Sequence, residues 1–189
     1  MLAQPHDKPK PSASVTAPPA NFDEAYTQGF AYVWSTLRRM GVREASLPDV
    51  THDVFIVVFR RWNDFDSARP LRPWLFGIAY RVASDHFALA HQRRERLDAD
   101  VATDHVAHEP SPERALESAQ RRAMVHEALQ EIPMEQRAVL IAFDLEEQPM
   151  NEIALAMEVP VKTGYSRLRL AREALVGALD RALRRRGER

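Results

Sequence analysis

The sequence contains no cysteine, and its six glycines are scattered along 189 residues rather than clustered. The absence of cysteine excludes disulfide frameworks, thiolate metal sites and cysteine nucleophiles, although it fits any redox compartment. Without clustered glycines there is no phosphate-cradling loop, so the use of ATP is not indicated. We therefore expect a protein that is not an enzyme and that needs no cofactor.

Long apolar runs are also missing. No stretch approaches the roughly 20 apolar residues that a membrane-spanning helix needs, and no charged-then-apolar leader opens the chain. We expect no membrane insertion and a cytoplasmic location. With 45% hydrophobic and 28% charged residues, the chain still has enough apolar material for one ordinary domain or two small ones.

The seven histidines leave one enzymatic alternative, a metal-dependent helical enzyme. His105 and His108 fall in a stretch without helical periodicity, and the histidines of the predicted helices lack ligand spacing such as HExxH. A stoichiometric metal assay tests this alternative, and we expect no metal site.

The net charge of −1 is unevenly distributed. Residues 113–160 carry 4 arginines against 10 acidic residues, a balance of −6, whereas residues 161–189 carry 9 basic residues against 3 acidic ones, a balance of +6. Such a layout directs one surface toward a polyanion and leaves another acidic. Arginine, which dominates the basic residues, makes bidentate contacts with phosphates and guanine edges. Because a charge run also fits a solvated helix face, this pattern alone leaves both interpretations open.

The residue pattern of the first half of the chain predicts a leader followed by three helices. Residues 1–20 contain five prolines and no periodicity, which is typical of a disordered leader. The first helix begins at Asn21 as N-cap and ends before Gly41. The second begins at Ser46, with Asp49 at the capping-box position, and the third runs over about 73–91. The apolar side chains expected to face the core are Val50, Val54, Val57, Val58, Trp62, Leu75, Ile78, Ala79 and Val82.

The residue pattern of the second half of the chain predicts a separate helical domain. Periodicity stops over 96–111, which is acidic and ends in prolines, so we expect a flexible linker there. Ser111 is the expected N-cap of the following helix. The predicted helices are 112–131, 134–145, 149–157 and 161–185. No strand pattern or internal repeat competes, so the predicted fold class is all-α: two small helical domains, 21–95 and 112–189, joined by a flexible linker.

The most specific stretch is 151–172, which reads NEIALAMEVPVKTGYSRLRLAR. A short helix with small Ala154 on its apolar face is followed by a three-residue turn, whose Val159 plugs the corner, and then by a helix that begins with basic and hydroxyl side chains. This arrangement is typical of a helix-turn-helix whose second helix reads the major groove. Taken alone, it also fits an ordinary helical corner.

This stretch resembles the fourth sigma domain of the extracytoplasmic-function group of bacterial RNA polymerase sigma factors, whose typical run is close to EEIAEALGVPVGTVKSRLHRAR. The first domain resembles the same group independently. Its LPDVTHDVFIVVFRRWNDFD is similar to the polymerase-binding helix of the second sigma domain, and its RPLRPWLFGIAYRVASDHF is similar to the promoter-melting segment. The resemblance covers about 22–94 and 112–183. It implies a sigma factor that binds core RNA polymerase and directs promoter-specific initiation.

The resemblance also implies roles for matching positions. Those expected to bind polymerase are Asp49, His52 and Asp53, with Phe55 or Ile56 as an apolar anchor. Those expected at the −10 element are Phe65, Arg69, Arg72, Tyr80, Arg81, Arg93 and Arg94, whereas Trp74 and Phe76 are assigned to the core. Those expected at the −35 element are Lys162, Thr163, Tyr165, Ser166, Arg167, Arg169 and Arg172. The family is commonly held inactive by an anti-sigma protein, so such a partner is implied as well.

Several positions depart from the family pattern. Glu158 stands where the turn usually has glycine, and Gly164 and Tyr165 stand where valine and a basic residue are usual. A glycine inside a helix costs about 1 kcal/mol relative to alanine, so we expect the recognition helix to be short, kinked or ordered only on DNA. A second hypothesis is a helix-turn-helix regulator that binds operators without joining polymerase. The 49–55 stretch distinguishes the two, because such a regulator has no reason to carry it.

Overall fold

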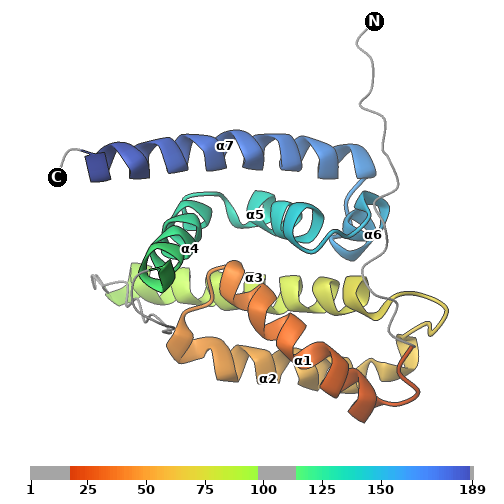
Figure 1. Ribbon diagram of the computed structural model, residues 1–189. Helices are drawn as coiled ribbons and strands as arrows, with labels where there is room; N and C mark the ends of the chain where they lie inside the picture. Colours follow the sequence, from red (N-terminus) through yellow and green to blue (C-terminus); the bar gives the residue numbers. More distant parts are fainter. Residues whose placement is uncertain (1–17, 98–113, 188–189) are drawn as a thin grey trace, which may run out of the picture.

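The computed structural model describes residues 18–97 and 114–187, and every regular element in these ranges is helical (Figure 1). The α-helices are α1 (Phe22–Arg39), α2 (Leu47–Arg60), α3 (Leu71–Leu97), α4 (Arg114–Gln130), α5 (Met134–Leu140), α6 (Met150–Ala156) and α7 (Val161–Gly187). Short 3-10 turns lie at η1 (Glu44–Ser46) and η2 (Trp62–Asp64), and a π-helical turn, η3 (Ile141–Leu145), continues α5. The all-α prediction is confirmed. Most of the predicted leader and linker, and the Ser111 cap, lie outside the described residues.

The first helix begins and ends as its sequence predicts. The side chain of Asn21 accepts a hydrogen bond from the Glu24 N–H at 2.9 Å, which satisfies one of the free donors at the start of α1. Gly41 follows the helix at φ 96°, a left-handed conformation that favours glycine. Both caps are therefore set by local chemistry.

The second and third helices differ from their predicted bounds. The capping box expected at Ser46 and Asp49 is wrong: Ser46 makes no side-chain cap and already has helical backbone angles. The cause is η1, in which Ser46 and Leu47 both donate to the Arg43 carbonyl, so α2 continues directly from this turn. The third helix, α3, extends the predicted range at both ends, reaching Leu97 within the expected linker.

The predicted apolar stripes form the core of the first domain. Val50, Val54, Val58, Leu75, Ile78 and Ala79 are buried, and Val57, Val82 and Trp62 are partly buried against the same cluster. Trp62 follows α2 in the turn η2 rather than lying in the helix. Spacing at three and four residues thus identified the inward faces of α2 and α3.

In the second domain, the recognition helix α7 packs across α4, α5 and α6 (Figure 1). The helix is continuous through Gly164 as far as Gly187, so the expectation of a short helix is wrong. An added Cβ at Gly164 would lie 2.6 Å from Sδ of Met150, the buried first residue of α6. The glycine therefore permits two helices to approach closely instead of bending one of them.

The two domains also lie against each other, which no sequence pattern indicated. Helix α3 contacts α6, and buried side chains of both domains belong to one apolar cluster. At this boundary the Gln148 side-chain amide donates to the Tyr32 hydroxyl at 2.6 Å. Buried Arg137 donates to the Met40 carbonyl at the end of α1, at 2.7 Å. The described structure is thus one packed body built from two helical units.

Candidate nucleic-acid interface

Aromatic side chains gather where the loop after α2 meets the start of α3. The ring of Phe65 lies 5.4 Å from the ring of Trp62 and 5.0 Å from that of Trp74 between centroids. Phe65 and Trp74 are both partly buried. The fully buried Phe76 stacks on half-buried Tyr80 at 6.4 Å. The assignment of Phe76 to the core is confirmed, and Trp74 is partly buried against the core while its ring also contacts Phe65.

The arginines around this cluster have partners. Arg69 pairs with a carboxylate of α6, and Arg81 pairs with one in the turn after α6. The guanidinium of Arg72 lies 5.5 Å from the centre of the Tyr32 ring. The side chains of Arg93 and Arg94 lie outside the described part. Three of the predicted −10 arginines therefore surround one end of the first domain, facing the second.

The start of α7 presents polar side chains on the outer face of the helix-turn-helix. Lys162, Tyr165, Ser166, Arg169 and Arg172 are exposed, and Thr163 and Arg167 are half-buried. On the opposite face, Leu168 and Ala171 are buried in the core. A helix with one buried apolar face and one exposed basic face, held by a packed partner helix, has the form of a major-groove reader.

The three arginines nearest the start of α7 are paired within the protein. Arg167 pairs with Glu135 and Arg169 with Glu173. Arg172 makes two bonds to Asp144 of the π-helical turn, Nε to Oδ2 at 2.9 Å and Nη2 to Oδ1 at 2.6 Å. These bonds raise the pKa of Arg172 above its usual value. Arg172 thus links α7 to η3. Its side chain can bind a DNA phosphate only if the ion pair with Asp144 breaks.

The chain resembles two families of sigma-factor domains in the same order as its two helical units. Sigma-70 region 2 matches residues 26–95, and Sigma-70, region 4 matches residues 122–175. The RNA polymerase sigma-H factor of Pseudomonas aeruginosa is 33% identical over 145 residues, covering 72% of this chain and 74% of that protein. This chain belongs to the RNA polymerase sigma factors.

Further relatives place this sigma factor in the extracytoplasmic-function group. The ECF RNA polymerase sigma-E factor of Escherichia coli K12 is 26% identical over 151 residues, covering 76% of this chain and 79% of the relative. Among solved structures, the sigma factor RpoE in complex with the anti-sigma factor NepR from Bartonella quintana aligns with a TM-score of 0.66 at 19% identity, covering 84% of this chain and 96% of that one. CnrH in complex with the cytosolic domain of CnrY aligns at 0.60 and 23% identity, covering 84% and 87%.

The family membership decides between the two functional hypotheses. An operator-binding regulator requires only a helix-turn-helix, but this sigma factor also carries region 2, the match that covers the first domain. The regulator hypothesis is therefore not favoured.

No helix in the described ranges is both long and apolar enough to cross a bilayer.

In this sigma factor, the exposed face of α2 carries Asp49, His52 and Asp53, opposite the buried valine stripe. Ile56 is partly buried on the same face. Phe55 does not offer the exposed anchor expected of it, because it is 4% exposed and packs against the aromatic rings of α1. Its position four residues after Thr51 and three before Val58, both buried, puts it on the inner side of the helix.

Sequence reasoning missed functional candidates at the end of α2 and at the domain boundary. Phe59, at the end of α2, is 65% exposed and packs edge-on against Phe22. Glu152 and Glu158 reach arginines of the first domain. The only available signal was Glu158 in place of the usual turn glycine, because pairing across 77 residues leaves no local pattern.

Proposed function

We propose that residues 21–95 act as sigma domain two, residues 112–189 act as sigma domain four, and 96–111 link them behind the leader 1–20. The first would bind core polymerase and open the −10 element, and the second would read the −35 element. Support comes from the two family matches, which fall within these ranges. We propose a cytoplasmic protein without catalytic activity of its own, since polymerase supplies the chemistry.

Polymerase docking would use the exposed face of α2. Asp49 and Asp53 are exposed, lie one helical turn apart and form no ion pair with any described residue. Unpaired carboxylates favour a basic partner, and partly buried Ile56 with exposed Phe59 supplies apolar area beside them. This acidic face is the observation that supports the proposal most directly.

Charge reversal tests this docking face. The double variant Asp49→Lys, Asp53→Lys is expected to weaken association with purified core polymerase at least tenfold. Its stability is expected to fall by no more than about 1 kcal/mol, because both residues are exposed and only Asp49 lies in the first turn of α2. Asp85→Lys, at an exposed position of α3, is the matched control. Binding is measured by fluorescence titration of labelled protein against core polymerase, and unaltered affinity in the double variant rejects the docking face.

Promoter opening would use the aromatic cluster and its arginines. A base displaced from the duplex gains about 1–3 kcal/mol by stacking on an aromatic ring, and partly buried Phe65 and Tyr80 are the candidates for this contact. Arg69, Arg72 and Arg81 lie nearby as phosphate ligands, and the exposed start of α7 would enter the major groove. Neither domain needs high affinity alone, because polymerase holds both on one promoter.

Transcription from a genomic library tests the function as a whole. Purified core polymerase with this protein is expected to initiate at start sites that share two short upstream elements. Core polymerase alone is the control. A lack of specific initiation at low salt would contradict the proposal.

We also propose an anti-sigma protein as a partner. The two structural neighbours described above are complexes with NepR and with the cytosolic domain of CnrY. A purified partner of this kind is expected to abolish initiation in the same transcription assay at equimolar concentration.

A further inference from the structure

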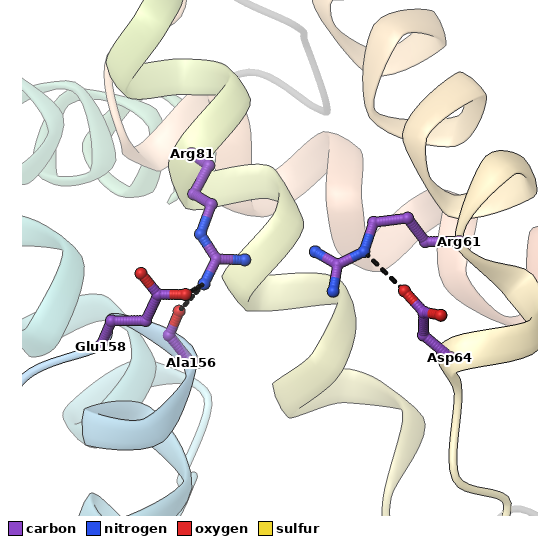
Figure 2. A network of polar contacts seen from close by, with 5 residues as sticks. All are labelled: Arg61, Asp64, Arg81, Ala156 and Glu158. Atoms are coloured by element: carbon purple, nitrogen blue, oxygen red, sulfur yellow. Dashed lines mark hydrogen bonds and ion pairs between the residues drawn. The ribbon is translucent and has the colours of Figure 1, made fainter.

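Two arginines that the proposed function assigns to promoter phosphates are paired with carboxylates of the helix-turn-helix. Arg69 pairs with Glu152 of α6. Nη2 of Arg81 lies 2.6 Å from Oε1 of Glu158 in the turn, as Figure 2 shows. A carboxylate offers a guanidinium the same kind of acceptor oxygens as a phosphate. The acidic side chains therefore bind the guanidinium groups that the proposed function assigns to DNA phosphates.

The same contact covers the loop that would receive the displaced strand. A pocket between the domains is lined by Phe65, Trp74 and Gly77 on one side and by Leu155 and Ala156 of α6 on the other. An added Cβ at Gly77 would lie only 3.1 Å from the Ala156 carbonyl oxygen, so the two helices approach closely there. With α6 in this position, the aromatic rings form one wall of a pocket whose other wall is α6, which narrows the space for an unstacked base.

Glu158 is an unusual residue for its place in the turn. Its backbone has φ 56°. Its N–H donates to the Leu155 carbonyl, and that of Val159 donates to the Ala154 carbonyl, which together form a Schellman ending of α6. Glycine is the usual residue at this position, because a side chain in the left-handed region is strained. The carboxylate of Glu158 makes a contact with Arg81 that glycine cannot make.

Glu147 offers an internal comparison for Glu158. It is also a glutamate with a left-handed backbone, at φ 54°, and it is exposed. Unlike Glu158, it forms no ion pair with any residue in the described ranges. Replacing each with glycine removes the same charge and the same backbone strain, but only one replacement removes a contact between the domains.

We propose that ion pairs between the domains add to their shared apolar contact in holding the free protein closed, with Glu158 as a latch whose carboxylate occupies Arg81 in place of a promoter phosphate. Closure rests on the contacts themselves, and only the competition with DNA rests on the proposed function. A single exposed ion pair shifts an equilibrium by about two- to fivefold. The latch therefore biases the domains toward contact without locking them.

Distance measurements on the full chain test the latch. Because the chain has no cysteine, spin labels can be attached at Gln28→Cys on α1 and Val176→Cys on α7, both at exposed positions. Pulsed electron resonance then reports the separation of the domains. The unmodified background is expected to give a narrow short-distance population, and Glu158→Gly is expected to increase the long-distance fraction about two- to fivefold.

Two further variants test whether the ion pair between Glu158 and Arg81, and not the loss of a glutamate from a left-handed turn, holds the domains together. Glu147→Gly is expected to leave the distance distribution unchanged. The charge swap Arg81→Glu with Glu158→Arg is expected to restore the short-distance population. Glu158→Gly is also expected to raise the melting temperature while it opens the domains, because glycine relieves the strained turn. A residue with a merely structural role would lower the melting temperature on replacement.

A mixed-sequence single-stranded oligonucleotide probes the competition with DNA. The free Glu158→Gly protein is expected to bind it about two- to fivefold more tightly than the unmodified protein, and the oligonucleotide is expected to shift the unmodified protein toward longer distances.

Three outcomes would overturn the latch: an open distribution in the unmodified protein, no change in Glu158→Gly, or equal opening by Glu147→Gly and Glu158→Gly. If Glu158→Gly opens the domains but Arg69→Ala and Arg81→Ala leave promoter opening by the polymerase complex unchanged, the latch stands. In that case the assignment of these two arginines to DNA fails.

Discussion

At the scale of single residues, packing decides what effect a residue has on its helix. Gly164 interrupts the family pattern and would weaken an isolated helix, yet α7 runs through it without a break. Its neighbour there is Met150, which is 2% exposed and has its Sδ 2.6 Å from the place of a Cβ at Gly164. A side chain at this position would therefore force the buried Met150 side chain to move.

Gly164→Ala is expected to lower the free energy of unfolding by about 1–3 kcal/mol, because overpacking against Met150 outweighs the gain of about 1 kcal/mol in helix propensity. Gly177→Ala, in the same helix, is the matched control. Its Cβ would lie 3.3 Å from the movable guanidinium of Arg181, so it is expected to raise stability by up to about 1 kcal/mol. Urea unfolding measures both, and equal effects would show that Met150 imposes no constraint.

The ionisation of Tyr32 makes the stability of the fold depend on pH. Burial, helped by the negative charge of Glu146, raises the pKa of the Tyr32 hydroxyl well above its usual value. An unfolded tyrosine ionises near about pH 10. Below that pH both states are protonated and the stabilising contribution is complete. Above it the unfolded state loses its proton first, so stability falls as the pH rises.

Tyr32→Phe is expected to remove this alkaline loss of stability. At neutral pH the variant is expected to lose about 1 kcal/mol, because the buried Gln148 amide loses its acceptor. Tyr26→Phe, with a side chain 42% exposed, is the control. Thermal unfolding between about pH 8 and 11 and absorbance titration of the tyrosines give the two readouts. If Tyr32 ionises together with the exposed tyrosines, the assignment is wrong.

At the scale of elements, one side chain of α5 satisfies the free carbonyls at the ends of two other helices. Arg137 is 8% exposed and donates to the carbonyls of Met40, Ile132 and Gln130 at 2.7, 2.9 and 3.2 Å. Helix ends leave such carbonyls without partners. Burial lowers the pKa of Arg137 to about 10, so its guanidinium stays charged at neutral pH.

Arg137→Lys is expected to lower the free energy of unfolding by about 2–4 kcal/mol. An ammonium group lacks the planar fork that reaches acceptors on separate segments, so buried carbonyls lose their donors. Arg121→Lys, at an exposed position of α4, is expected to change stability by less than about 0.5 kcal/mol. Chemical denaturation measures the difference, and similar values for the two variants would contradict the role of Arg137.

At the scale of the whole molecule, the proposed function divides promoter phosphate contacts between two domains. If about six phosphates are neutralised in the polymerase complex, the logarithm of affinity falls with the logarithm of salt at a slope near −5. Arg69→Ala and Arg81→Ala are each expected to reduce the steepness by about 1. Arg38→Ala, whose pair with Glu44 lies within the first domain, is expected to leave it unchanged. Anisotropy titrations of labelled promoter with the assembled polymerase measure the slopes, and an unaltered slope in both test variants removes these contacts.

The sequence by itself determined the helices, their inward faces and the helix-turn-helix. These features depend on neighbours three or four residues apart, as the Asn21 cap and the valine stripe of α2 illustrate. The family resemblance added the functional class, which the comparisons confirm. Local errors arose where a neighbouring turn changed the backbone, as η1 does at Ser46.

Only the tertiary structure decided which charged and aromatic side chains are exposed and which already have a partner within the protein. Phe55 is buried and Phe59 exposed, Arg172 is bound to Asp144, and Glu158 reaches Arg81. Each of these facts depends on a partner 28 or more residues away, or on which helix covers a face. The physical reason is that helical periodicity specifies the direction of a side chain relative to its own helix, whereas its partner is set by how the helices pack.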